Sequence, residues 1–298
     1  MCIAVLASSL WLIPLTRSEE IPIVANILNA EPEILGITVS SPGLPGGWVD
    51  PGSEFEISVE VRDNNTLEDI DGLQVILYAP SSSEVDGDGE SDHYRFSWSS
   101  ADGFRNAGGV GAMVADRCTT PGDKTLGVGF WTFRAKLDKA ALYSSGWTAV
   151  CYASDEEESD RGETRFPVSK YGSLYLDSSS LSFSGQPGTL ASADQNPIEL
   201  RYTSNYQARI RCWATDFIGV ENGDMVLAPS SFSVDDDADP GGQEEGLPFL
   251  TLEAQRQIFA DGLSPAEDSS ISVYLYISIP DTFYDQDYAG SIYFDMGS

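Results

Sequence analysis

The chain has 298 residues, and its 47 aspartates and glutamates against 16 lysines and arginines give a formal net charge of −31. Such an acidic surface repels phosphate backbones, which excludes ordinary nucleic-acid binding and makes anionic membranes poor partners. Hydrophobic residues form 41% of the chain, enough to build a folded core. Lysine is scarce beside arginine, and an acidic, lysine-poor surface suits a salty extracellular setting in which ions screen self-repulsion. Acidity that serves solubility alone is the alternative.

The amino-terminal region is strongly apolar. Residues 2–15 are too few to span a bilayer of about 30 Å, and they have the length of a signal-peptide core, although no basic segment precedes them. We therefore assign residues 1–20 either as a signal-like segment or as a strand donated to a neighbouring subunit. The sequence has no apolar run of transmembrane length and no hydrophobic tail at its end, so no transmembrane anchor is expected.

Strand patterns dominate the first half of the chain. Residues Glu54–Arg62 alternate strictly between apolar and polar side chains, as a strand with one buried face requires, and turn residues flank them. Similar runs predict about seven strands, the number typical of an immunoglobulin-like sandwich. The other runs are Ile34–Ser40, Leu73–Ala79, His93–Ser99, Gly109–Ala115, Val128–Lys136 and Trp147–Ala153, with a short last strand at Arg165–Val168.

A second series of strands starts near Tyr171. The strongest member is Ile271–Ile279, where five aliphatic residues alternate with serine and tyrosine. Residues Leu252–Asp261 read as a short helix or a turn. The expected fold is all-β, with two immunoglobulin-like antiparallel β-sandwich domains in tandem, at residues 21–169 and 170–298. The remaining predicted strands are Leu174–Asp177, Leu181–Ser184, Pro197–Thr203, Ala208–Thr215, Met225–Ala228, Pro248–Leu252 and Tyr288–Phe294.

Two segments carry a resemblance to a known type of module. Residues Val49–Ser53 lead into an alternating strand that closes at Asp63 and Asn64, and this opening resembles Ig-like modules of archaeal and bacterial cell-surface proteins. Residues Ile279–Thr282, followed by Tyr288–Phe294, are similar to the closing hairpin of such modules. The resemblance implies a module used in surface layers, sheaths, extracellular filaments and adhesins, without an assigned activity, and it favours an archaeal source.

Cysteine and histidine offer little catalytic chemistry. Four cysteines without a closely spaced pair exclude zinc ribbons and thioredoxin-type centres; Cys118 and Cys151 could form a disulfide or be buried free thiols. His93 is the only histidine, it lacks a nucleophile elbow, and its acidic surroundings favour a solvated loop over a catalytic base. We therefore expect no enzyme. Asn64 begins the only glycosylation sequon and could carry a glycan.

Two acidic loops are candidates for binding Ca²⁺ or other cations, since calcium takes six to eight oxygen ligands from flexible loops. One loop holds Asp86, Asp88, Glu90 and Asp92, and the other holds Asp235, Asp236, Asp237 and Asp239. Neither fits the EF-hand pattern, and solvated acidic loops are the alternative.

Aromatic residues could supply contact surfaces. Tyr274 and Tyr276 alternate with the aliphatic residues of their strand, so both should lie outside the sandwich or at a contact, whereas Trp98, Trp131, Trp147 and Trp213 should lie in cores. The sequence thus favours a secreted structural subunit that assembles as a homo-oligomer or homopolymer into a surface layer, sheath or filament. The alternatives are an adhesin or carbohydrate-binding module, or a virion structural protein.

Overall fold

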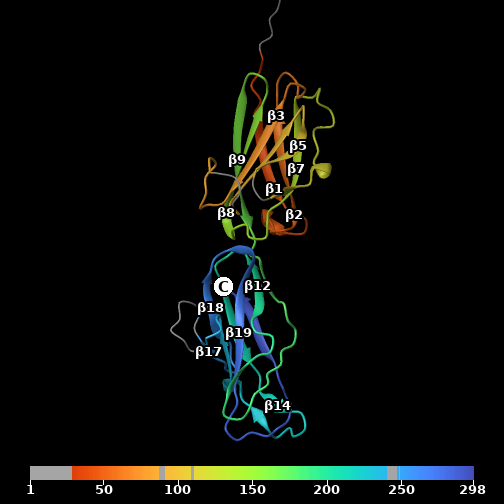
Figure 1. The fold of residues 1–298 in the computed structure, drawn as a ribbon. Helices are drawn as coiled ribbons and strands as arrows, with labels where there is room; N and C mark the ends of the chain where they lie inside the picture. Colours follow the sequence, from red (N-terminus) through yellow and green to blue (C-terminus); the bar gives the residue numbers. More distant parts are fainter. Residues whose placement is uncertain (1–28, 87–90, 109–110, 240–246, 248) are drawn as a thin grey trace, which may run out of the picture.

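The computed structural model describes residues 29–86, 91–108, 111–239, 247 and 249–298. The chain is built from antiparallel strands and forms two immunoglobulin-like β-sandwiches in tandem, which confirms the expected fold class. The sandwiches lie end to end in an elongated molecule (Figure 1). The apolar segment 1–20 lies outside the described residues. Within the described ranges, no helix is both long enough and apolar enough to cross a membrane.

The first sandwich has the strand order of a variable-type immunoglobulin domain. One sheet has the order β1-β2-β7-β6 and the other β5-β4-β3-β8-β9, which correspond to A-B-E-D and C″-C′-C-F-G. The strands are β1 (Glu33–Ser40), β2 (Glu54–Arg62), β3 (Gly72–Tyr78), β4 (His93–Ser99), β5 (Gly103–Gly108), β6 (Ala112–Met113), β7 (Val128–Lys136), β8 (Ser144–Ser154) and β9 (Ser159–Val168).

The core of this sandwich follows from the alternation in its strands. Every second residue of β2, from Phe55 to Val61, is fully buried between the sheets. Trp131 and Trp147 are also fully buried, and Trp98 packs on Trp131 with ring centroids 5.5 Å apart. These three tryptophans lie in the core as predicted. Trp213 does not: it is half-buried in the second sandwich and stacks on the exposed Tyr293.

The second sandwich pairs a large sheet, β10-β12-β19-β16-β17 with β11 also on β19, with a sheet of order β18-β13-β21 and a small sheet β15-β14-β20. The strands are β10 (Gly172–Leu176), β11 (Leu190–Ser192), β12 (Ile198–Ser204), β13 (Ala208–Ala214), β14 (Phe217–Gly219), β15 (Val226–Leu227), β16 (Phe232–Asp235), β17 (Leu250–Thr251), β18 (Gln257–Leu263), β19 (Ala266–Ser278), β20 (Tyr288–Ala289) and β21 (Ile292–Gly297).

Three further local expectations in the second sandwich were wrong. Residues Gln257–Leu263 form strand β18 on β13 and not a helix, with two register shifts that break the period-two pattern. The expected strand at Leu181–Ser184 is reduced to a single bridge between Phe183 and Ala193. Tyr276 is only 5% exposed, because its hydroxyl donates to the Asp237 carbonyl oxygen at 3.2 Å and the Phe249 ring centre lies 6.2 Å from that of Tyr276.

The described cysteines are free thiols, so no Cys118–Cys151 disulfide is present. Burial raises the pKa of the Cys151 thiol, and it raises the pKa of Cys212 to about 12. Both thiols therefore stay protonated at neutral pH and should react slowly. In a Cys2→Ser chain, we expect a thiol reagent to modify Cys151 and Cys212 only after unfolding. Mass spectrometry of the peptides measures the modification of each thiol. Rapid modification of either thiol in the folded chain would contradict this packing.

Candidate functional site

The first acidic loop is only partly within the described residues. Asp88 and Glu90 lie outside them. The Asp86 carboxylate accepts hydrogen bonds from the Ser83 backbone N–H (2.5 Å) and the Ser82 hydroxyl (3.0 Å), and these bonds lower the pKa of Asp86. Asp92 contributes its carbonyl oxygen to the Ala79 N–H at 2.8 Å. Asp86 therefore organises a tight turn of its own.

His93 begins strand β4 directly after this loop, and it is fully buried. Its Nε2 lies 3.4 Å from the Glu84 carbonyl oxygen. The expectation of a solvated histidine was wrong, because β4 pairs with β3 from its first residue, where His93 lies opposite Tyr78.

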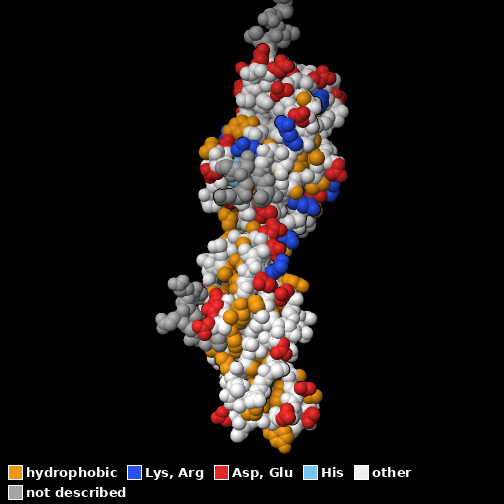
Figure 2. All heavy atoms as spheres, viewed as in Figure 1, with side chains coloured by type: hydrophobic (Ala, Val, Ile, Leu, Met, Phe, Trp, Pro, Cys, Tyr) orange, Lys and Arg blue, Asp and Glu red, His pale blue; other side chains and the backbone are white. Residues whose placement is uncertain are grey.

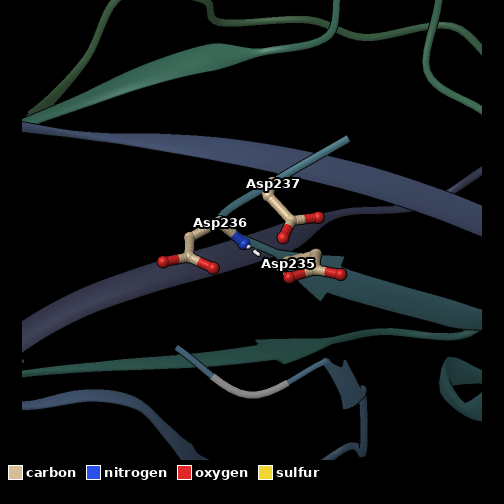
Figure 3. Close-up of side chains that lie close together, drawn as sticks. All are labelled: Asp235, Asp236 and Asp237. Carbon is tan, nitrogen blue, oxygen red and sulfur yellow. Dashed lines mark hydrogen bonds between the residues drawn. The ribbon is translucent and has the colours of Figure 1, made fainter. Parts of the chain in front are cut away.

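The second acidic loop brings three carboxylates together. Asp235, Asp236 and Asp237 each place a carboxylate oxygen within 4.8 Å of the others (Figure 3). Asp235 is fully buried as the last residue of β16, Asp236 is half-buried, and Asp237 is exposed. Asp239 is not part of this cluster; its backbone N–H donates to the Asp237 carboxylate at 2.7 Å.

Backbone groups around the cluster hold it in place. The Asp236 N–H donates to the Asp235 carboxylate at 2.8 Å, and the Leu247 N–H donates to the Asp236 carboxylate at 3.0 Å. The Tyr276 hydroxyl donates to the Asp237 carbonyl oxygen at 3.2 Å. Burial, with further contributions from the negative charges of Asp235 and Asp237, raises the pKa of Tyr276 to about 12. The Tyr276 hydroxyl therefore keeps its proton and can donate this hydrogen bond throughout the physiological pH range.

The donor set of this loop suits a hard cation, since carboxylate oxygens are the ligands that Ca²⁺ takes. Calcium bound there should raise the free energy of unfolding by about 2.7 kcal/mol when its concentration is one hundred times Kd. Millimolar Ca²⁺ should therefore raise the melting temperature of the chain. A chain with Asp236→Asn and Asp237→Asn should lose most of that calcium-dependent gain. The matched control is Asp261→Asn, which removes an exposed carboxylate bound to Arg209. Equal calcium responses in both chains, measured by calorimetry, would argue against the site.

Sequence reasoning missed a polar joint between the two sandwiches. Asn205, in the turn between β12 and β13, is fully buried. Its side-chain Nδ2 donates to the carbonyl oxygens of Ala141 (2.9 Å) and Ser169 (2.7 Å), and its Oδ1 accepts from the Tyr171 N–H (2.8 Å). Its own carbonyl accepts from the Tyr143 N–H at 2.8 Å. One asparagine thus ties the second sandwich to the first and to the segment that connects them.

Cations on aromatic rings surround this joint. The Lys139 ammonium lies 5.9 Å from the Tyr171 ring centre, and the Lys170 ammonium lies 4.0 Å from that of Tyr206. Contacts of this type add about 0.5–1 kcal/mol each when exposed. The Lys139 contact therefore joins the first sandwich to the segment that leads into β10, whereas Lys170 and Tyr206 both lie on the second-sandwich side of the joint. Figure 2 shows blue side chains at the junction between the two bodies.

An apolar groove opens in the second sandwich, in its half away from the joint. Its volume is about 320 Å³, and its floor contains the buried Ile198 and Leu275. Its half-buried apolar lining consists of Leu176, Leu181, Phe183, Phe217, Ile292 and Phe294. The other lining residues are four serines and a glycine, and among the described residues no charged side chain lines the groove. The face in Figure 2 shows hydrophobic side chains running along this sandwich.

A separate, polar depression lies on β10 and β12. Tyr175 is 64% exposed at its edge, and Arg201 lies 3.7 Å from Asp268 across it. An exposed ring beside hydrogen-bonding side chains is an arrangement that can stack on a sugar. These residues are not recognisable as a group in the sequence, because only strand pairing brings β10, β12 and the start of β19 together.

Comparisons with known proteins add the following. No protein-family model and no curated protein matches the chain. A solved structure described as titin Ig tandem domains A164-A165 is similar over 90% of this chain and 96% of that one, with 7% sequence identity and a TM-score of 0.28. Because this score is low, the assignment of two Ig-like sandwiches rests on the strand orders and the two cores described above.

Proposed function

We propose that the chain is an extracellular structural subunit that self-associates into a surface layer, sheath or filament, as a homo-oligomer or homopolymer. The observation that carries the proposal is the Asn205 joint. It holds two sandwiches end to end with buried hydrogen bonds to Ala141 and Ser169, so that the tandem is a rod of defined geometry. Defined geometry is what repeated contacts between copies require.

The charge of the chain sets the conditions for association. Copies that each carry −31 repel one another. Salt limits the range of this repulsion to a Debye length of about 8–10 Å at 0.1–0.15 M ionic strength and about 3 Å at 1 M. Cations bound by the Asp235–Asp237 cluster would offset it further. We propose that the setting is a salty cell surface. We propose an archaeal one because the modules of the chain resemble Ig-like modules of archaeal cell-surface proteins. Asn64 is exposed on its turn, where an extracellular chain could carry a glycan.

Electron microscopy of the purified chain tests this function. We expect regular polymers at high salt with calcium, shorter or fewer polymers after chelation, and single rods at low salt. Particles that remain single under all three conditions would overturn the proposal. An Asp261→Asn chain, which loses one surface carboxylate outside the acidic loops, is the control and should form polymers under the same conditions as the unchanged chain.

A carbohydrate-binding module is the second candidate, and the depression beside Tyr175 favours it. In that case, the chain should bind glycans on an array as a monomer, and Tyr175→Ala should abolish binding. Tyr284→Ala is the matched control, since Tyr284 is equally exposed at 64% but lies outside the depression. Glycan binding without polymers would favour this function over self-association.

A further inference from the structure

The two sandwiches differ at one strand position. In the first, β9 lies in the G position: it pairs with β8 and packs against β1, where a methyl group on Gly162 would come within 2.7 Å of Ile34. In the second sandwich, β10, β12, β19 and β16 occupy the A, B, E and D positions, β13 occupies C, and β21 occupies F. Among the described residues, no strand occupies G beside β21.

The groove lies where that strand would be. Both β10 and β21 are edge strands of their sheets in the described structure. They come close near the joint, where a methyl group on Gly172 would lie 2.6 Å from Met296 Cε. Farther from the joint they line the apolar groove, with Leu176 at the end of β10 and Ile292 at the start of β21. The groove therefore combines open strand edges with exposed core side chains, which is the arrangement that accepts an added strand.

We propose that residues Ile21–Leu28 of a second copy of this chain fill the groove as the missing strand. This inference rests on the proposed self-association and names its contact. The segment is uncharged, as is the groove lining, and Ile21, Ile23, Ala25 and Ile27 alternate along it. Eight residues span about 26 Å as a strand, and the six residues of β21 span about 20 Å.

The donor must be a second copy, because the segment is too short to reach its own groove. Asn29 follows it directly and is bound to Asp155 (2.8 Å) and Asn65 (2.8 Å), at the end of β8 away from the joint. Fully extended, eight residues reach about 29 Å. The 11 residues of β8 already separate Asn29 from the joint by about 33 Å, and the groove lies beyond the joint.

The direction of the strands also fits a linear assembly. Strand β21 runs towards the joint, since Ile292 pairs with Ala214 and Gly297 with Arg209 at its two ends. An added strand antiparallel to β21 runs away from the joint and leaves at the far end of the second sandwich. There it continues into Asn29 of the donor, so that the first sandwich of one copy follows the second sandwich of another. Such a head-to-tail contact produces a filament when the rotation from copy to copy does not close a ring.

Cysteine cross-linking between two different chains tests the contact. Both chains carry Cys2→Ser; one also carries Ile23→Cys and the other Ser180→Cys, an exposed serine of the groove lining. Mixed at high salt under mild oxidation, they should form a disulfide-linked pair in high yield. The control replaces Ser180→Cys by Ser270→Cys, an exposed serine on β19 outside the groove, and should form at least tenfold less. A Leu181→Asp chain, checked for its fold by circular dichroism, should polymerise at least tenfold less.

The outcomes separate the contact from the function. Polymers together with the Ile23→Cys to Ser180→Cys cross-link support both. Polymers without that cross-link, and with no effect of Leu181→Asp, overturn the strand contact and leave self-association standing. A cross-link without polymers supports the contact and removes the filament. The absence of both overturns both.

Discussion

Replacing Asn205 by alanine is expected to destabilise the folded tandem by about 2–5 kcal/mol and to release the two sandwiches from their fixed relation. The change removes three hydrogen bonds and leaves the carbonyl oxygens of Ala141 and Ser169 and the N–H of Tyr171 without this partner. A buried polar group that loses its partner costs about 1–3 kcal/mol, and water entering the joint recovers part of it. Chemical denaturation measures the first effect, and small-angle X-ray scattering measures the second as a broader distribution of distances within the particle.

The matched control is Asn222→Ala. Asn222 is exposed, and its side-chain oxygen accepts one bond from the Asp224 N–H at 3.2 Å, so this change should cost little. An Asn205→Ala chain with unchanged stability and an unchanged scattering profile would show that the joint does not hold the sandwiches in place.

Replacing Trp147 by alanine is expected to cost about 3–5 kcal/mol, the usual loss for a large aromatic side chain removed from a core. Trp147 is fully buried, its ring lies 5.9 Å from that of Tyr94 and 6.0 Å from that of Phe166, and its indole N–H donates to the Leu142 carbonyl at 2.8 Å. We propose that residues 21–169 and 170–298 are separate folding domains. The loss should therefore fall only on the unfolding transition of the first sandwich, which contains Trp147.

Trp213→Ala is the control for this change. Trp213 lies half-buried on the outer face of β13 between Tyr293 and Arg256, whose guanidinium is 4.9 Å from its ring. Its removal should cost about 0.5–1.5 kcal/mol, the value of an aromatic pair. Calorimetry resolves the two transitions. Equal losses for both variants would contradict the placement of Trp147 in the core and of Trp213 outside it.

Alternation made two strands of the first sandwich predictable from the sequence, whereas β5 was not expected and β9 is longer than the predicted Arg165–Val168. The pattern in Glu54–Arg62 and in His93–Ser99 gives the bounds of β2 and β4, because each strand buries one face against the opposite sheet. The pattern could not reveal β18, where Phe259 and Ala260 are both buried next to each other at a register shift. Adjacent buried residues of this kind read as a helix or a turn in the sequence.

The candidate sites were less predictable, because pairing decides them. Asp235 belongs to an acidic run that reads as a solvated loop, yet it pairs with Tyr274 as the last residue of a strand and is buried. Asn205 reads as an ordinary turn residue, and its role depends on groups that are 36 and 64 residues away in the chain. The groove lies beside β21, where the described residues include no further strand, and no local pattern in the sequence records this.

Sedimentation velocity of the full chain in brine tests self-association most directly. Over a rising series of protein concentrations, the account predicts a shift of material from single rods to large species whose sedimentation grows with concentration and reverses on dilution. A single species of constant sedimentation coefficient up to millimolar protein would contradict it.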